Sequence, residues 1–154
     1  MNKFLIKNSQ RNAQGLFSTL AYEPNQVLFK FEGKNISTGD MLKHPNSEKL
    51  LQIGDNMYVD LGSHYSAFTN HSCNPNCYVK IAINTAFLIS ARDIAIGDEL
   101  FFDYSLTSTD TLDTWKMDCK CHKFYCRKVI SGFSTIPEEK KKSLIKAGMV
   151  PAYQ

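Results

Sequence analysis

The sequence lacks the features that mark several classes of protein. No stretch of its 154 residues approaches the roughly 20 apolar residues that a membrane-spanning helix needs, and residues 1–14 are too polar for a secretory leader. It has no internal repeat, no low-complexity tract and no long linker rich in glycine, serine or proline. We therefore expect one soluble domain in the cytoplasm or nucleus, with export to another cell left open.

The chain also has little net charge. Its 18 basic and 15 acidic residues leave a formal charge of +3, and the basic residues are scattered apart from the lysine run at 140–142. A nucleic-acid-binding surface is usually strongly basic. We expect no direct nucleic-acid partner and no membrane partner, and we interpret the lysine run as the solvated face of a helix. The oligomeric state stays open.

Short strand patterns fill most of the sequence. Residues 27–31, 78–83 and 86–90 are rich in β-formers, and the turn pairs Glu32-Gly33, Asn84-Thr85 and Gly97-Asp98 separate such segments. The pattern predicts a mainly β domain.

The last segment is instead typical of a helix. Thr135 and Glu138 match a capping box, and Gly148 and Pro151 follow the helical pattern. We expect one helix over residues 137–147, packed through Leu144 and Ile145, with no function beyond packing.

Five cysteines without a secretory leader indicate reduced thiols or metal ligands. Cys119, Cys121 and Cys126 lie close enough together for one loop to wrap a tetrahedral ion, but they supply only three of its four corners. Zinc is the expected ion because thiolates in tetrahedral geometry favour it, and a site closed by four thiolates is structural.

The fourth ligand has three candidates in Cys73, Cys77 and His122. His122 directly follows Cys121, so it would need a sharp reversal of the chain to reach the same ion. Cys73 precedes the turn-forming pair Asn74-Pro75, which would present its sulfur on a loop. We prefer Cys73 and expect Cys77 to be the unpaired thiol.

Three motifs carry a resemblance to a known family. Residues 70–77 read Asn-His-Ser-Cys-Asn-Pro-Asn-Cys, residues 99–104 read Glu-Leu-Phe-Phe-Asp-Tyr, and the cysteine loop follows them in order. Together they resemble the SET domain family of protein lysine methyltransferases with its post-SET zinc loop. Gly15-Leu16-Phe17 is similar to the family's early glycine turn, although Ala13 stands where the first glycine is usual. The lysine-rich helix has no counterpart in this pattern.

The resemblance implies a SET-type fold of several short sheets. It divides the chain into a SET domain at 1–112, a post-SET zinc loop at 113–130 and a C-terminal helical extension at 131–154. It also implies S-adenosylmethionine as the cofactor. The residues expected around that cofactor are Gly15, Leu16, Phe17, Asn70, His71, Tyr104 and Trp115. Trp115 has two readings that stay equally open, a ring stacked on the adenine and an anchor that packs the cysteine loop.

The resemblance makes Tyr104 the expected catalytic residue, because methyl transfer to an amine needs alignment and desolvation more than covalent help. His71 is expected to contribute to the cofactor pocket and not to act as a base. Phe102, two positions before Tyr104, leaves room for a methylated amine and predicts di- or trimethylation. Phe31 replaces a tyrosine of the family, so Tyr58 or Tyr65 is the candidate for a further hydroxyl in the substrate channel.

The predicted activity is therefore transfer of a methyl group to a lysine of a histone-like or other protein. Two alternatives remain. One is a catalytically silent SET fold that binds peptides, against which Tyr104 argues. The other is a small zinc-linked nucleic-acid binder, for which the basic surface is weak and the aromatic residues are dispersed.

Overall fold

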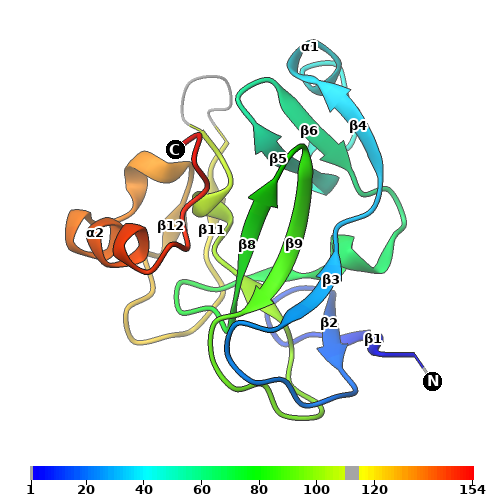
Figure 1. Ribbon diagram of the computed structural model, residues 1–154, viewed down its shortest axis with the longest axis vertical. Coiled ribbons are helices and arrows are strands. Elements are labelled where there is room, and N and C mark those ends of the chain that lie inside the picture. The colour runs from blue at the N-terminus through cyan, green and yellow to red at the C-terminus, as the bar shows by residue number, and fades with distance from the viewer. Residues whose placement is uncertain (1, 110–114) are drawn as a thin grey trace.

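The structure is a computed structural model that describes residues 2–109 and 115–154. Over that part of the chain, short strands form five small sheets, and the two α-helices are short (Figure 1). The prediction of a mainly β fold with few helices is confirmed. The boundary predicted between residues 112 and 113 lies outside the described residues. None of the described helices is long and apolar enough to cross a membrane.

Two antiparallel sheets of three strands form most of the body. The first orders β3 (Val27–Lys30), β9 (Thr85–Ser90) and β8 (Cys77–Ala82), and the second orders β4 (Lys34–Ser37), β6 (Met57–Asp60) and β5 (Leu50–Gly54). Helix α1 (Thr38–Met41) follows β4 directly. The predicted strands at 27–31, 78–83 and 86–90 agree with β3, β8 and β9 to within one residue at each end.

The turn between β8 and β9 differs from the prediction. Ala82 pairs with Thr85, so the two turn residues are Ile83 and Asn84 and not Asn84 and Thr85. Both have positive φ angles, 41° and 58°, as a tight hairpin that matches the strand twist requires. A β-branched residue rarely adopts such an angle, which is why composition alone points one residue too far along the chain.

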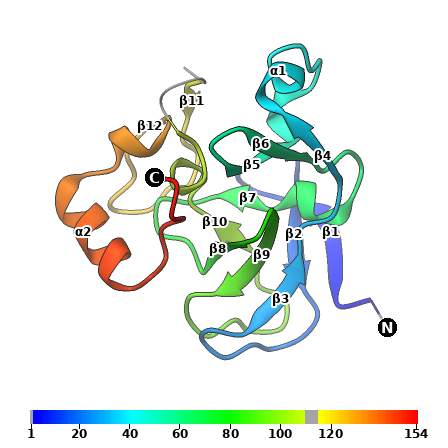
Figure 2. The ribbon, with the colours of Figure 1, turned by 45° about the horizontal axis from the view of Figure 1, so that its top comes forward.

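Three pairs of short strands complete the sheets. They are the antiparallel hairpin of β1 (Phe4–Asn8) and β2 (Gln14–Ser18), the parallel pair of β7 (Asn70–His71) and β10 (Phe101–Phe102), and the antiparallel pair of β11 (Met117–Asp118) and β12 (Val129–Ile130). The β7–β10 pair lies at the centre of the molecule, with the β1–β2 hairpin on one side and the C-terminal helix on the other (Figure 2).

The main apolar core fixes which way the central strands face. Leu16, Leu88 and Leu100 have no exposed surface, and Phe102 packs in the same cluster. Burying a side chain of this size stabilises the fold by about 1.5–3 kcal/mol. Leu100 and Phe102 are two residues apart, and both side chains are buried in this core. Because successive side chains of an extended segment point to opposite faces, the residues next to them point away from it.

The C-terminal helix α2 (Glu138–Lys146) lies within the predicted range. Gly148 has a φ of 68° and its N–H donates to the carbonyl of Ile145, so the predicted glycine stop is confirmed. Two details were wrong. The capping box does not form, because the Thr135 hydroxyl donates to the Gly132 carbonyl inside a short 3-10 turn. Ile145 is also 58% exposed, so it does not pack on the body.

Candidate functional site

The parallel pairing of β7 with β10 brings two of the sequence motifs together. Asn70 lies opposite Phe101 and His71 lies opposite Phe102. The pairing continues for one more step, since the Ser72 N–H donates to the Phe102 carbonyl over 3.1 Å. Residues some 30 positions apart in the sequence therefore form one site, and Tyr104 follows directly in a 3-10 turn, Tyr104–Leu106.

Tyr104 is held in place by hydrogen bonds at both ends. Its hydroxyl donates to the Thr69 carbonyl over 2.9 Å, and its backbone N–H donates to Nδ1 of His71 over 3.2 Å. Its ring lies 4.8 Å from that of Phe102 and 5.4 Å from that of His71. Burial raises the pKa of Tyr104 well above its ordinary value, so the phenol stays protonated. The site thus presents a neutral, oriented hydroxyl.

His71 is a buried imidazole with both nitrogens engaged. Burial lowers its pKa to about 4, so the ring is neutral near physiological pH. Since Nδ1 accepts from the Tyr104 N–H, the ring proton resides on Nε2, which lies 3.4 Å from the sulfur of Cys73. His71 therefore connects the backbone at Tyr104 to the cysteine cluster, and neither nitrogen is left over to act as a base.

Asn70 is oriented by groups from three other segments. Its amide nitrogen donates to the Gln14 carbonyl and to Oε1 of Glu99, each over 2.8 Å. Its amide oxygen accepts from Asn12 over 3.3 Å, and the other carboxylate oxygen of Glu99 accepts from the Ser9 hydroxyl over 3.1 Å. Glu99 opens the second motif, but its sequence position gave no sign that it would orient Asn70.

Gly15 lies against this carboxylate. A Cβ atom built on Gly15 would be 2.1 Å from Oε1 of Glu99 and 3.0 Å from the amide nitrogen of Asn70, far inside van der Waals contact. The backbone at Gly15 approaches Glu99 so closely that a residue with a Cβ atom would clash, and this explains the glycine at that position.

We expect the substitution Gly15→Ala to weaken cofactor binding about tenfold and to cost about 1 kcal/mol of stability, because Glu99 must give up its bond to Asn70. Calorimetric titration with S-adenosylhomocysteine and thermal unfolding measure the two effects. Gly39→Ala is the matched control, since the nearest atom to its added Cβ is 3.7 Å away. Equal behaviour of the two variants would contradict the close-approach argument.

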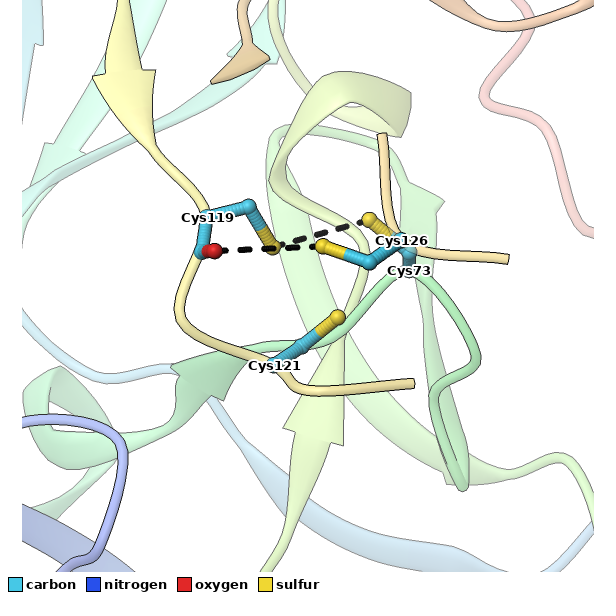
Figure 3. Close-up of side chains that lie close together, drawn as sticks. All are labelled: Cys73, Cys119, Cys121 and Cys126. Atoms are coloured by element: carbon cyan, nitrogen blue, oxygen red, sulfur yellow. Dashed lines mark hydrogen bonds between the residues drawn. The ribbon is translucent and has the colours of Figure 1, made fainter. Parts of the chain in front are cut away.

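Four cysteines converge beside His71. Figure 3 shows the side chains of Cys73, Cys119, Cys121 and Cys126 pointing toward one another from two separate loops. Their sulfur atoms all lie within 4.8 Å of one another, and those of Cys73 and Cys119 are 3.6 Å apart. Four thiolates about 2.3 Å from one tetrahedral zinc ion would be separated by about 3.8 Å. The cluster can hold a metal ion of that kind.

Hydrogen-bond donors surround two of the four sulfur atoms. The sulfur of Cys73 lies 3.5 Å from the backbone N–H of Arg127 in addition to Nε2 of His71, and the sulfur of Cys126 accepts from the Lys128 N–H over 3.4 Å. Hydrogen bonds of this kind fix the orientation of groups that bind a metal. The surroundings therefore suit metal binding.

The other two candidates for the fourth corner lie elsewhere. Cys77 begins β8 in the main core with no exposed surface, and burial raises the pKa of its thiol to about 12. His122 is exposed and its φ is 50°, so the chain does reverse after Cys121, but its ring lies outside the set of converging groups. Among the described residues the set is the one that the sequence favoured, with Cys73 from the first motif.

Asp103, the residue before Tyr104, is a fully buried carboxylate beside this cluster. The guanidinium of Arg127 lies 2.5 Å from its Oδ1 atom, and Nδ1 of His71 lies 3.6 Å from the same oxygen. Because His71 is neutral, the arginine and not the histidine balances the charge of Asp103. This ion pair joins the second motif to the residue that follows Cys126.

Comparison with known proteins identifies the family. The family model described as SET domain matches residues 13–105, more than half of the chain. The chain belongs to the SET domain family. This match includes the glycine turn, Asn70, His71 and Tyr104, and the resemblance to the SET domain family is confirmed. The cysteine loop at 119–126 lies beyond the matched residues, and its four converging thiols are compatible with a post-SET zinc loop.

The relatives that this chain matches are much larger proteins, and the similarity is confined to a small part of each. The chain is 28% identical over 139 residues to "Histone-lysine N-methyltransferase trithorax" of Drosophila virilis, and 31% identical over 115 residues to "Histone-lysine N-methyltransferase MEDEA" of Arabidopsis thaliana. These alignments cover 82% and 66% of this chain but only 4% and 16% of the relatives. A protein of Aspergillus oryzae named as specific for H3 lysine-36 is 26% identical over 141 residues, which is 82% of this chain and 14% of the relative.

Trp115 packs against the cysteine cluster of this SET domain. Its indole N–H donates to the Ser108 hydroxyl over 2.6 Å, and its carbonyl accepts from the Ser131 hydroxyl over 2.5 Å. It is one of the partly buried residues around Cys73, Cys121 and Ile130. These contacts fit an anchor of the cysteine loop, and stacking on an adenine ring stays a prediction.

Three aromatic residues considered for the substrate channel belong to one group of contacting rings, and they are Phe31, Phe102 and Tyr65. Phe31 lies edge-on to Phe102 at 6.1 Å, so it belongs to the group that ends at Tyr104. Tyr65 stacks on Phe4 at 5.5 Å and is joined to Phe31 through Phe29, whose ring centre lies 5.3 Å from that of Tyr65 and 5.2 Å from that of Phe31. Tyr58 is buried in β6 and contributes, after burial, to the raised pKa of Tyr153 near the C-terminal end. Its role in a channel stays a prediction.

Leu16 and Phe17 of the glycine turn serve different purposes in the SET domain. The Leu16 side chain is fully buried in the core and its carbonyl accepts from the Leu100 N–H over 2.8 Å. Leu16 as a whole residue has no exposed surface, and its contact with a cofactor stays a prediction. Phe17 is half-buried beneath the ammonium group of Lys7, 5.5 Å from its ring centre.

Arg11 is a site residue that the sequence did not reveal. It lies in the turn between β1 and β2, donates to the Cys121 carbonyl over 2.6 Å and covers the Phe101 ring at 4.4 Å. It therefore ties the N-terminal hairpin to the cysteine loop, 110 residues away in the sequence. No local pattern signals such a contact, because arginines on turns are common.

Proposed function

We propose that this SET domain transfers methyl groups from S-adenosylmethionine to a lysine side chain of a protein. The observation that carries the proposal is the placement of Tyr104, whose neutral hydroxyl is fixed on the Thr69 carbonyl beside Asn70 and His71. The names of the relatives, all histone-lysine N-methyltransferases, support the same activity.

The reaction would use this chain for orientation and for exclusion of water. When bound, S-adenosylmethionine supplies a methyl group on a cationic sulfur. Gly15, Leu16, Phe17, Asn70 and His71 would hold it, with Trp115 beside them. Tyr104 would align the acceptor, and its ring would favour the cationic centre.

An acceptor lysine must lose its proton before it can attack. The aromatic rings of Phe31, Phe102 and Tyr104 pack together, and an apolar wall of this kind lowers the pKa of an amine by desolvation. Proton loss to water on entry would then need no dedicated base, in agreement with the full hydrogen bonding of His71.

The four converging cysteines would hold a structural zinc ion. They leave no corner open for water or substrate, so the ion would fasten the loop of Cys73 to the segment from Cys119 to Cys126. The chemistry would rest on the cofactor and Tyr104, and the metal would keep the cofactor site assembled.

The substrate class that the relatives favour is a histone-like tail, which would place the protein in the nucleus or cytoplasm. A flexible lysine-bearing tail enters a narrow channel readily, and exposed lysines of other proteins would fit the same channel. Incubation of the purified domain with tritiated S-adenosylmethionine, core histones and a cell lysate tests both. A labelled protein band that is lost with Tyr104→Phe is the expected result.

The alternative of a silent peptide-binding module predicts a different outcome. The domain would then bind cofactor and lysine peptides but label none of them. Absence of label from zinc-loaded protein that binds S-adenosylhomocysteine would overturn the proposed activity.

We expect Phe102→Tyr to shift the product toward monomethyl-lysine. The ring centres of Phe102 and Tyr104 are 4.8 Å apart. A hydroxyl added to the Phe102 ring would occupy the space that a methylated amine needs. Mass spectrometry of the methylated peptide measures the product distribution. Phe124→Tyr is the control, since that ring is 93% exposed. A wild-type enzyme that yields only monomethyl-lysine would contradict the prediction.

A further inference from the structure

Lys140 of the C-terminal helix contacts residues next to His71 and Tyr104. Lys140 of α2 donates from its ammonium group to the carbonyl of Cys73, and its Nζ atom lies 3.8 Å from Oδ2 of Asp103. Its side chain is 34% exposed, whereas that of Lys142 two residues later is 71% exposed. The prediction that the lysine run forms a solvated helix face was wrong for Lys140, and also for Lys141, whose side chain is 14% exposed and lies over the Phe133 ring.

Asp103 makes this contact consequential. Arg127 satisfies Oδ1 of the carboxylate, while Oδ2 accepts no hydrogen bond from any described residue. The ammonium group of Lys140 is the cation that faces this second oxygen. A buried carboxylate is costly unless both of its oxygens are compensated, so Lys140 completes what Arg127 begins.

The two groups that Lys140 holds are adjacent to the two groups that build the site. Cys73 comes two residues after His71, and Asp103 comes directly before Tyr104. His71 and Tyr104 are themselves joined by the hydrogen bond from the Tyr104 N–H to Nδ1. Because the Lys140 ammonium group contacts both the Cys73 carbonyl and the Asp103 carboxylate, it restricts how far His71 and Tyr104 can move apart.

We propose that Lys140 is a positioning residue of the cofactor site, acting through the Cys73 carbonyl and the Asp103 carboxylate on His71 and Tyr104. The inference rests on the proposed methyl-transfer function. The helix lies outside the residues matched by the SET domain model, which end at 105, so α2 is an addition that this chain uses to brace its site.

Charge adds a second reason for a lysine at this place. Four thiolates around one zinc ion carry a net charge of about −2, and Asp103 adds another negative charge next to them. Arg127 supplies one positive charge and Lys140 a second within the same region. A neutral side chain at position 140 would leave this buried negative charge less compensated.

The test compares zinc-loaded full-length variants at one position. Lys140→Met removes the charge and keeps the length of the stem, Lys140→Gln is a second neutral variant should the first fold poorly, and Lys140→Arg restores the charge. Lys142→Met is the matched control on the same helix, where the lysine pairs with the exposed Glu139. Calorimetric titration with S-adenosylhomocysteine, zinc content and steady-state kinetics are measured for each.

The expected result is a roughly tenfold weaker affinity for S-adenosylhomocysteine in Lys140→Met and Lys140→Gln at unchanged zinc content, with KM for S-adenosylmethionine raised by a similar factor. Lys140→Arg should recover most of the affinity, and Lys142→Met should equal the wild type. Unchanged affinity in both neutral variants would overturn the proposal, as would a loss that merely follows the loss of zinc.

The binding measurement separates this inference from the proposed activity. Wild-type protein that binds S-adenosylhomocysteine but methylates nothing, with weakened binding in Lys140→Met, would refute methyl transfer and uphold the positioning role. Wild-type protein that methylates its substrate, with a Lys140→Met variant of equal activity and equal affinity, would uphold methyl transfer and refute the positioning role.

Discussion

Substitution of Tyr104 by phenylalanine is expected to lower the rate of methyl transfer about 100-fold or more. The variant loses the hydroxyl that donates to the Thr69 carbonyl, and with it the oriented polar group at the meeting point of the two central motifs. Removing one preoriented group from an active site typically costs a factor of about 100 to 1,000 in kcat. The ring remains, so its packing on Phe102 and His71 should persist.

Single-turnover kinetics with tritiated cofactor measure this loss directly. Affinity for S-adenosylhomocysteine should change by less than about threefold, and stability by about 1 kcal/mol for the lost hydrogen bond. Tyr125→Phe is the matched control, because that side chain is 80% exposed on the cysteine loop. A Tyr104→Phe variant that keeps more than a tenth of the wild-type rate would remove Tyr104 from the catalytic role.

Removal of the metal is expected to abolish both cofactor binding and activity without touching a group that contacts the reacting atoms. Cys121→Ser removes one of the four converging thiols, at a residue that is 1% exposed and whose carbonyl accepts from Arg11. Structural zinc sites contribute on the order of 10 kcal/mol to the folded state at neutral pH. Without that contribution the segment from Cys119 to Cys126 should detach from Cys73.

Zinc analysis, thermal unfolding and titration with S-adenosylhomocysteine follow this change. Cys77→Ala is the matched control, since it removes a buried thiol of the main core and should cost about 1 kcal/mol while the full zinc content remains. Full cofactor affinity in chelator-treated, metal-free protein would show that the cysteine cluster and the cofactor site are independent.

Features set by short-range patterns could be predicted from the sequence. The strands β3, β8 and β9 and the helix α2 follow from residue preferences and lie within a residue of their predicted bounds. The cysteine cluster could also be predicted from the sequence. The spacing of Cys119, Cys121 and Cys126 supplies three of the four ligands of a tetrahedral ion, and the turn after Cys73 favours that residue as the fourth.

Some of the errors are local, and others arise where a long-range contact decides the outcome. Thr135 has the composition of a cap, but its hydroxyl bonds to a nearer carbonyl in the preceding turn. Lys140 reads as one of three solvated lysines until the fold brings Cys73, 67 positions away in the sequence, against it. Glu99 and Asp103 belong to a motif, yet their partners are set by the packing of β7 against β10. Periodicity and composition carry no information about such partners.

The chain between the two loops of the cysteine cluster has a consequence for folding. Cys73 and Cys119 are 46 positions apart, and the intervening chain includes β8, β9 and β10. A metal ion that joins the ends of such a loop lowers the conformational entropy of the open chain, by about 4 kcal/mol at 25 °C in the estimate used for cross-links. The pair of β7 with β10 is only two residues long, and it joins the residues just before Cys73 to a strand inside this loop. A metal ion bound by the four cysteines should therefore stabilise this short pair, and the yield of folded chain should rise with the zinc supplied during folding.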